Sequence, residues 1–141
     1  MKSNLTAKSL HISIVISEFN LKITERLLQG ALDAFAHYNG LIPNITIYRV
    51  PGAFEIPGTI KQILIHNSPH AIVALGAVIR GETSHFDFVA RGAIDGISKI
   101  SRTTDIPIIN GILTTENIEQ ALHRSKINGM NKGWDAIEAA I

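Results

Sequence analysis

Short runs of β-branched residues alternate with helical patterns along the whole chain. The predicted strands cover residues 11–17, 44–50, 71–79 and 106–113, and the predicted helices cover 23–38, 53–67, 86–101, 116–125 and 131–141. The third strand, AIVALGAVI, is apolar throughout, which is typical of a strand buried on both faces. Regular alternation of strand and helix predicts right-handed crossovers and a parallel sheet covered on both sides, in an α/β fold.

Glycine, proline and threonine residues predict where the helices begin and end. Gly40 is expected to stop the first helix. Pro57 is compatible with the second helix only in its first turn. Thr114 or Thr115 is expected to cap the helix at 116–125, whose early glutamate suits the helix dipole.

Three chemically mixed stretches occur where the first three predicted strands end. They are SEFN at 17–20, PGAFEIPG at 51–58 and GAVIRGETSH at 76–85. In a parallel α/β sheet, ligands bind beyond the carboxyl ends of the strands. The three stretches are therefore expected to converge on one site.

The composition favours an assembly of identical chains. Hydrophobic residues make up 45% of the 141 residues and charged residues 18%, which is apolar for a small domain. Part of the surface is therefore expected to lie between subunits. Residues 1–141 are interpreted as a single domain, in which a polar N-terminal arm at 1–10 is expected to cross to a neighbour's sheet edge.

Charge and cysteine content argue against several classes of function. The formal net charge is +1 and the basic residues form no stripe, so no nucleic-acid partner is expected. The chain has no cysteine, which excludes disulfides, thiolate metal sites and cysteine nucleophiles. No apolar run is long enough to span a bilayer, and the start MKSNLTAKSL lacks the apolar core of a signal peptide. A cytoplasmic location without a membrane partner is expected.

The stretch at 76–88 approaches a nucleotide-binding P-loop without matching it. That pattern requires Gly, four residues, Gly, Lys and then Ser or Thr, whereas Glu82 stands here in place of the lysine. Backbone amides around Gly81 and Glu82, together with Thr83, can still form an anion site at a helix start. Arg124 could hold a phosphate monoester through two hydrogen bonds, although an exposed helix-end arginine is the commoner case.

Three further residues carry candidate chemistry, each with a plainer alternative. Phe19 could present its ring to a flat heterocycle, or could be a core phenylalanine covering the first helix. Glu55 could bind the hydroxyls of a polyol, or could be an acid at a helix start favoured by the helix dipole. His85 could transfer protons near neutral pH, or could be an ordinary helix-start histidine.

Other familiar constellations are missing from the sequence. His66 and His70 have metal-like spacing, but Ser68 and Pro69 between them break the helix that would align them, so no metal site is expected. No Gly-x-Gly-x-x-Gly, Gly-x-Ser-x-Gly or paired-carboxylate arrangement is present. Hydride transfer, serine hydrolysis and glycoside cleavage therefore have no specific support.

Five segments match one protein family in order and spacing. They are FN at 19–20, VPGAFEIP at 50–57, LGAVIRGETSHFDFV at 75–89, GILTTENIEQA at 111–121 and NKG at 131–133. Through these segments the chain resembles the 6,7-dimethyl-8-ribityllumazine synthases of riboflavin biosynthesis. The resemblance extends over nearly the whole chain, and PGAFEIP and GAVIRGxTxHFD are far more specific than a lone glycine motif.

The resemblance implies a fold, an activity and an assembly. The fold would be a flavodoxin-like three-layer α/β/α sandwich with a four-stranded parallel sheet. The reaction would be the condensation of 5-amino-6-(D-ribitylamino)uracil with 3,4-dihydroxy-2-butanone 4-phosphate, without a metal or organic cofactor. The assembly would be a homopentamer with active sites between adjacent subunits. Whether pentamers pair into decamers or close into an icosahedral shell stays open.

The resemblance also implies roles for individual residues. Phe19 would stack on the pyrimidine, Lys132 would lie near it, and His85 would transfer protons. The other implied contacts are Asn20 next to Phe19, the ribityl-binding segment Ala53, Phe54, Glu55 and Ile56, backbone contacts from Val78 and Ile79, and a phosphate site of Gly81, Glu82, Thr83 and Arg124. Arg124 is expected on, or close to, the neighbouring subunit's side of the pocket.

Two departures from the family pattern bear on the site and the assembly. Asn110, in IPIINGIL, stands where many members carry an aromatic residue that walls the pocket across the subunit interface, so altered substrate affinity is expected. The stretch SKINGMNKG at 125–133 replaces the common GTKAGNKG near contacts between pentamers. This second departure leaves capsid formation open.

Three alternatives to a synthase follow from the same sequence. A noncatalytic lumazine- or flavin-binding protein would keep the pocket, but it would not need His85, Arg124 and Lys132 together. A related enzyme that dismutates two lumazines into riboflavin would use substrates without phosphate. A structural shell protein without catalysis is the weakest alternative.

Overall fold

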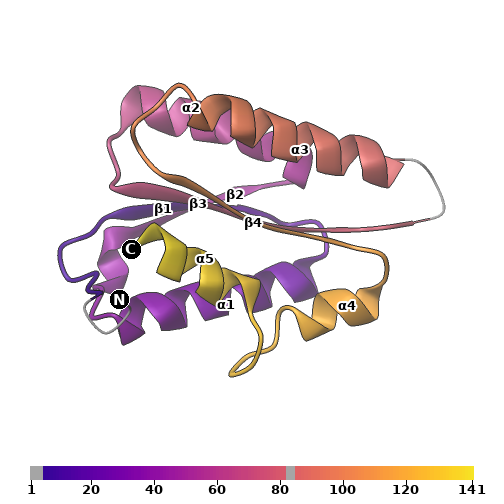
Figure 1. Ribbon diagram of the computed structural model, residues 1–141, viewed down its shortest axis with the longest axis horizontal. Coiled ribbons are helices and arrows are strands. Elements are labelled where there is room, and N and C mark those ends of the chain that lie inside the picture. The colour runs from indigo at the N-terminus through magenta and orange to yellow at the C-terminus, as the bar shows by residue number, and fades with distance from the viewer. Residues whose placement is uncertain (1–4, 82–84) are drawn as a thin grey trace.

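The computed structural model describes residues 5–81 and 85–141, and it contains all the predicted strands and helices (Figure 1). The strands are β1 (Ile12–Ser17), β2 (Ile45–Val50), β3 (Ala71–Ile79) and β4 (Ile108–Thr115). The α-helices are α1 (Leu21–His37), α2 (Ile56–His66), α3 (His85–Ser101), α4 (Ile118–His123) and α5 (Lys132–Ala140). Two short 3-10 helices, η2 (Ile42–Asn44) and η3 (Ala53–Glu55), precede β2 and α2.

The four strands form one parallel sheet in the order β2-β1-β3-β4. Helices α2 and α3 cover one face of this sheet, and α1, α4 and α5 lie on the other (Figure 1). The prediction of a flavodoxin-like three-layer α/β/α sandwich is therefore confirmed. Because the strands are parallel, their carboxyl ends meet at one edge of the sheet, at the right of Figure 1.

Two hydrophobic cores lie on the two faces of the sheet. In β1, Ile14 packs in the core that includes α1 and α5, whereas Val15 packs in the core that includes α2 and α3. In β3, Val73 and Ala74 divide in the same way. Both strands are central in the sheet, so both faces of each are buried, which explains the continuous apolar run of β3.

Helices α1 and α5 pack so closely that each requires a glycine. A Cβ on Gly133 would lie 1.9 Å from the carbonyl oxygen of Leu27, and a Cβ on Gly30 would lie 2.0 Å from Oδ1 of Asn131. At this short separation, Nδ2 of Asn131 donates a hydrogen bond to the carbonyl oxygen of Arg26 at 3.1 Å. The backbones of the two helices are therefore in near contact.

The first helix ends at a different residue from the one predicted. Helix α1 stops at His37, and Asn39, with φ 68°, adopts the left-handed conformation that follows the helix. Gly40 comes one position later and donates its N–H to the carbonyl oxygen of Phe35 at 2.8 Å. The prediction that Gly40 ends the helix was wrong because asparagine also tolerates the left-handed conformation and comes first in the chain.

The predicted threonine cap of α4 is also wrong. Thr114 and Thr115 both belong to β4, which pairs with β3 as far as Thr115. The N-cap is Asn117, whose Oδ1 accepts a hydrogen bond from the N–H of Gln120 at 2.8 Å. Pro57 does lie in the first turn of α2, as predicted.

Residues 5–81 and 85–141 contain neither a candidate membrane-spanning helix nor a candidate metal site. None of their helices is long and apolar enough to cross a membrane. These residues also contain no group of three or more His, Asp or Glu side chains that could hold a metal ion.

Candidate active site

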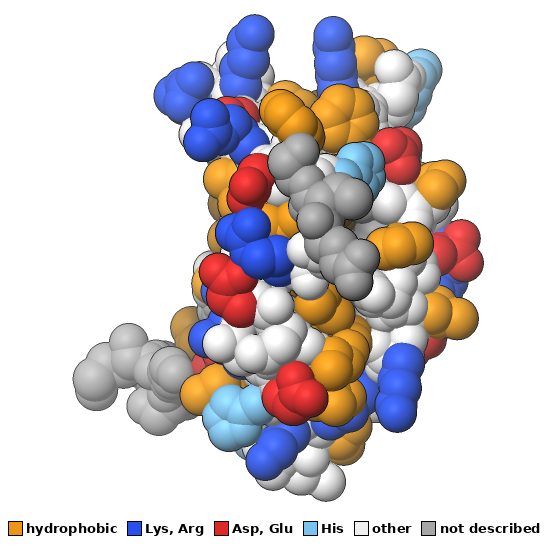
Figure 2. Space-filling view, turned by 90° about the vertical axis from the view of Figure 1, so that its right-hand side faces the viewer, with side chains coloured by type: hydrophobic (Ala, Val, Ile, Leu, Met, Phe, Trp, Pro, Cys, Tyr) orange, Lys and Arg blue, Asp and Glu red, His pale blue; other side chains and the backbone are white. Residues whose placement is uncertain are grey.

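A pocket of about 670 Å³ opens at the carboxyl ends of the strands. Its lining residues are Phe19, Asn20, Pro51, Gly52, Phe54, Glu55, Ala77, Val78, Ile79, Gly81, His85, Phe86, Phe88 and Val89. Figure 2 faces this end of the molecule and shows hydrophobic side chains gathered there. All three stretches that were predicted to converge contribute to the lining, so the predicted convergence is confirmed.

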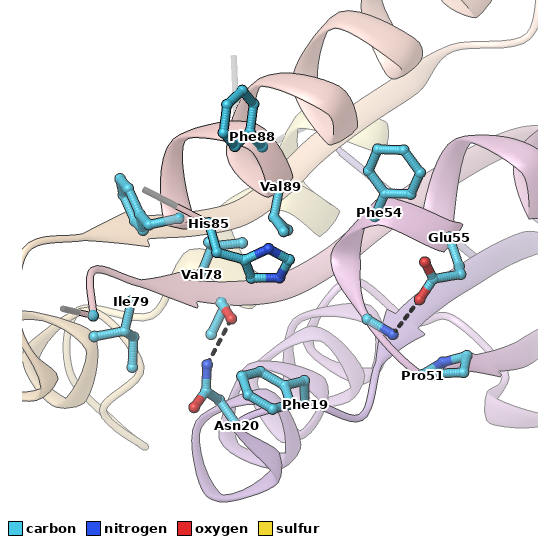
Figure 3. A pocket seen from close by; sticks show the side chains of 14 residues that line it. Phe19, Asn20, Pro51, Phe54, Glu55, Val78, Ile79, His85, Phe88 and Val89 are labelled. Atoms are coloured by element: carbon cyan, nitrogen blue, oxygen red, sulfur yellow. Dashed lines mark hydrogen bonds between the residues drawn. The ribbon is translucent and has the colours of Figure 1, made fainter. Parts of the chain in front are cut away.

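The connection between β1 and α1 presents Phe19 to the pocket. Its side chain is 71% exposed, so the alternative of a core phenylalanine is wrong. The N–H groups of Glu18 and Phe19 donate to the carbonyl oxygens of Val50 at 2.8 Å and Pro51 at 3.0 Å. These two bonds hold the connection against the end of β2, with the aromatic ring free to meet a ligand (Figure 3).

Asn20 holds the same connection against β3. Its backbone is left-handed, with φ 64° and ψ 47°, a conformation that asparagine adopts more readily than most residues. Its Nδ2 donates to the carbonyl oxygen of Ala77 at 2.9 Å (Figure 3), and its own carbonyl oxygen accepts from the N–H groups of Ile23 and Thr24. Asn20 therefore lines the pocket with a side-chain amide whose nitrogen is already hydrogen-bonded within the protein.

The turn at η3 brings Phe54 and Glu55 to the pocket and buries their neighbours. The Phe54 side chain is 61% exposed. Glu55 accepts a hydrogen bond at Oε1 from the N–H of Gly52 at 2.9 Å, so its carboxylate stabilises the turn as well as lining the pocket. Ala53 and Ile56 are buried in the core beneath α2 and α3, so their side chains do not line the pocket.

His85 stands at the beginning of α3, on the wall of the pocket. Its side chain is exposed and points toward the centre of the pocket in Figure 3. Val78 and Ile79, at the end of β3, and Gly81, two residues later, line the pocket next to it. An imidazole and an apolar floor suited to a flat ring therefore share one cavity.

Asn110, Arg124 and Lys132 do not line this single-chain pocket. Asn110 is exposed on β4, and its Oδ1 accepts a hydrogen bond from a backbone N–H two residues on at 3.0 Å. Arg124 follows α4 and Lys132 begins α5, and the N–H of Lys132 donates to the carbonyl oxygen of Arg124 at 2.9 Å. Glu82 and Thr83, two predicted phosphate ligands, lie outside the described residues.

Helix α3 contributes a wall of the pocket that was not predicted from the sequence. Phe86, Phe88 and Val89 line the pocket, and the Phe88 side chain is 70% exposed. The available signal was the segment HFDFV, which places apolar side chains in the first turns of a helix that begins at the site. Exposed apolar groups gathered in this way are typical of a surface that meets a ligand or another chain.

An ionic cluster links three segments next to the pocket. Nε of Arg80 donates to the carboxylate of Glu116, and Nη2 lies 3.3 Å from Oδ1 of Asp87. The same guanidinium covers the ring of Phe86, with Cζ 4.5 Å from the ring centroid. The hydrogen bond to Glu116 raises the pKa of Arg80 above its ordinary value.

Comparison with known proteins gives a consistent result over nearly the whole chain. Residues 9–141 match the family model described as 6,7-dimethyl-8-ribityllumazine synthase. The relative of that name from Chlorobium limicola is 43% identical over 141 residues, which are 100% of this chain and 91% of the relative. Relatives of the same name from Chlorobium luteolum and Chloroherpeton thalassium are 47% and 45% identical, over 97% and 100% of this chain and 88% and 91% of their own lengths. The chain belongs to the 6,7-dimethyl-8-ribityllumazine synthase family.

Proposed function

We propose that the chain condenses 5-amino-6-(D-ribitylamino)uracil with 3,4-dihydroxy-2-butanone 4-phosphate to give 6,7-dimethyl-8-ribityllumazine, orthophosphate and two waters. The observation that carries the proposal is the pocket itself. It collects an exposed aromatic ring at Phe19, a carboxylate at Glu55 and an imidazole at His85 from three of the segments that carry the family resemblance. The name shared by the relatives supports the same reaction.

The reaction divides into steps that each move a proton. The pyrimidine amine attacks the ketone of the butanone phosphate, and water leaves to form an imine. Phosphate is then eliminated to give an enol, and the ring closes with loss of the second water. A neutral imidazole such as that of His85 can accept and return these protons near neutral pH. The protein also holds the two reactants together, which can lower the barrier by roughly 7–11 kcal/mol.

The proposed substrate orientation follows the chemistry of the pocket walls. The pyrimidine stacks on Phe19, with backbone contacts from Val78 and Ile79. The ribityl chain runs toward Phe54 and Glu55, where the carboxylate can accept hydrogen bonds from hydroxyls. Ala53 and Ile56 belong to the same proposed segment, but with buried side chains they can contribute only backbone groups. Asn20 supports the connection that carries Phe19.

The phosphate is proposed to bind near Gly81, with Glu82, Thr83 and Arg124. Arg124 does not line the pocket of its own chain, which supports a site completed by an adjacent subunit in a homopentamer. Lys132 and Asn110 belong to the same proposal, each facing a pocket in the assembled protein.

The cytoplasmic location and the single domain at 1–141 with its arm at 1–10 stay predictions.

The direct test mixes purified protein with both substrates and follows lumazine absorbance together with orthophosphate. One phosphate is expected for each lumazine. In Arg124→Ala, we expect KM for the butanone phosphate to rise about tenfold to 100-fold, because a charge-assisted hydrogen-bonded contact contributes roughly 1.5–3 kcal/mol. The control is Arg102→Ala, which removes a similar helix-end arginine at the far end of α3 and should keep the original KM.

Other outcomes of this assay would change either the proposed function or the proposed phosphate site. Tight lumazine binding without turnover would identify a noncatalytic binding protein and contradict the proposal. Riboflavin formed from lumazine alone, without any need for the butanone phosphate, would identify the dismutating enzyme instead. An unchanged KM in Arg124→Ala would show that Arg124 does not bind the phosphate, and it would not contradict the synthase reaction.

The position of the Phe54 ring gives a prediction about substrate affinity. A Cβ on Gly92 of α3 would lie 2.7 Å from Cε2 and 2.9 Å from Cδ2 of Phe54, so Gly92→Ala should push the ring away from its place in the pocket. Because one aromatic contact contributes about 0.5–1.5 kcal/mol, KM for the ribitylaminouracil should rise roughly twofold to tenfold. Gly58→Ala in α2 is the control, because its Cβ meets nothing within 4 Å. Equal KM values in the two variants would contradict the prediction.

A further inference from the structure

We propose that Arg80 is a positioning residue for His85. In this role it ties the start of α3 to the end of β3 and to the segment that precedes α4. The inference rests on the proposed function, because it concerns how the proton-transferring imidazole is held. Arg80 has no role assigned to it by the family motifs described above, and its side chain does not line the pocket.

The contacts of Arg80 reach three separate segments. Its backbone N–H donates to the carbonyl oxygen of Thr115 at 2.9 Å, which extends the pairing of β3 and β4 by one residue. Its guanidinium donates to Glu116, beyond β4, and reaches Oδ1 of Asp87 on α3 at 3.3 Å. Through its backbone and its side chain, Arg80 thus joins the ends of β3 and β4 to the first turn of the helix that carries His85.

The contact with α3 is made at the two residues that follow His85. Asp87 pairs with the guanidinium, and the ring of Phe86 lies beneath it, with 4.5 Å between Cζ and the ring centroid. The first turn of α3 is therefore held from two directions, through a charge pair and through the face of an aromatic ring. Phe86 also lines the pocket, so a shift of this turn would move the pocket wall and the imidazole together.

Only an arginine can make all of these contacts at once. Its planar guanidinium offers five N–H donors in a fixed fork, so one group can bond two carboxylates while its plane stacks on a ring. A lysine ammonium at the same place could approach one carboxylate closely, but it would lack the flat surface that covers Phe86. The arrangement therefore requires the shape of arginine as well as its charge.

Because the cluster is exposed to solvent, its effect is expected in kcat and not in folding stability. The side chains of Arg80, Asp87 and Glu116 are 41%, 58% and 62% exposed. Ion pairs that are this accessible to solvent contribute little to folding stability, commonly less than about 1 kcal/mol. Reaction rate is far more sensitive, because a displacement of about 1 Å of a catalytic group can cost roughly 100-fold. A positioning role therefore predicts a loss of kcat with little loss of stability.

The test compares Arg80→Gln, Arg80→Lys and the control Arg102→Gln in the lumazine and orthophosphate assay. Arg102→Gln makes the same change in charge at the opposite end of α3, and wild-type turnover in the same assay tests the proposed function separately. We expect Arg80→Gln to lower kcat about tenfold, with both KM values within about threefold of wild type and an unchanged urea midpoint. Arg80→Lys should recover part of the lost kcat.

Two results would overturn the proposal while wild type remains active. One is an unchanged kcat in Arg80→Gln. The other is a higher KM for the butanone phosphate at an unchanged kcat, which would make Arg80 a phosphate ligand.

If Arg80→Gln does not fold, Glu116→Gln and Asp87→Asn are tested instead, because each removes one partner and leaves the arginine in place. Each should lower kcat about twofold to fivefold, and wild-type kcat in both would also overturn the proposal.

Discussion

Replacing His85 with alanine is expected to lower kcat by about 100-fold to 10,000-fold while leaving measurable turnover. General acid–base groups contribute roughly this much, and the imidazole of His85 points toward the centre of the pocket (Figure 3). Turnover should persist because the variant still holds the two reactants together, an effect that does not depend on the imidazole. The measurement is steady-state kcat from lumazine absorbance, with both substrates saturating.

The control for this experiment is His66→Ala. His66 is an exposed histidine in the last turn of α2 and does not line the pocket, so its loss should leave kcat unchanged. A His85→Ala protein that folds and binds substrate but shows no turnover would contradict the expected role of proximity. Wild-type kcat in His85→Ala would show that protons move through another group.

Replacing Gly133 with alanine is expected to destabilise the protein by roughly 3 kcal/mol, toward the upper end of the cost of overpacking. The added Cβ would lie 1.9 Å from the carbonyl oxygen of Leu27 and 2.8 Å from its carbonyl carbon. Both atoms belong to the backbone of α1, so neither can rotate away as a side chain would. Helix α5 would have to move off α1. The change should lower the urea midpoint of unfolding.

Gly58→Ala separates this clash from the general effect of the substitution. In a helix with open space, the change from glycine to alanine stabilises by roughly 0.5–1 kcal/mol, and the Cβ on Gly58 meets nothing within 4 Å. The two variants are therefore expected to change the free energy of unfolding in opposite directions. A Gly133→Ala protein as stable as wild type would mean that α1 and α5 can separate at little cost.

Several features of the site were predictable from local sequence. The run at 71–79 is apolar enough to identify a strand buried on both faces, and the parallel direction of this strand and the one at 11–17 places Phe19 and His85 at one edge of the sheet. Phe19 itself needed the structure, because a phenylalanine after a strand can be either core or ligand contact. Its 71% exposure depends on bonds from its connection to Val50 and Pro51.

Other features could not be predicted from the sequence, because they depend on contacts with residues far away in the chain. Ala53 and Ile56 belong to the same motif as Phe54, yet they are buried while Phe54 is exposed. The turn at η3 decides this difference by directing the side chains of Ala53 and Ile56 into the core and that of Phe54 to the pocket. Asn117 replaces the predicted threonines as the cap of α4 because β4 extends along β3 as far as Thr115.

The sequence by itself determined the order of strands and helices, the parallel sheet, and the edge at which the pocket opens. These follow from the periodicity of apolar side chains and from the rule that parallel strands share one carboxyl edge. Only the tertiary structure decided that Phe88 walls the pocket, that Arg80 joins Glu116 to Asp87, and that Gly133 touches α1. Each of these depends on how helices and loops far apart in the chain pack on the sheet, and a local sequence pattern does not predict that packing.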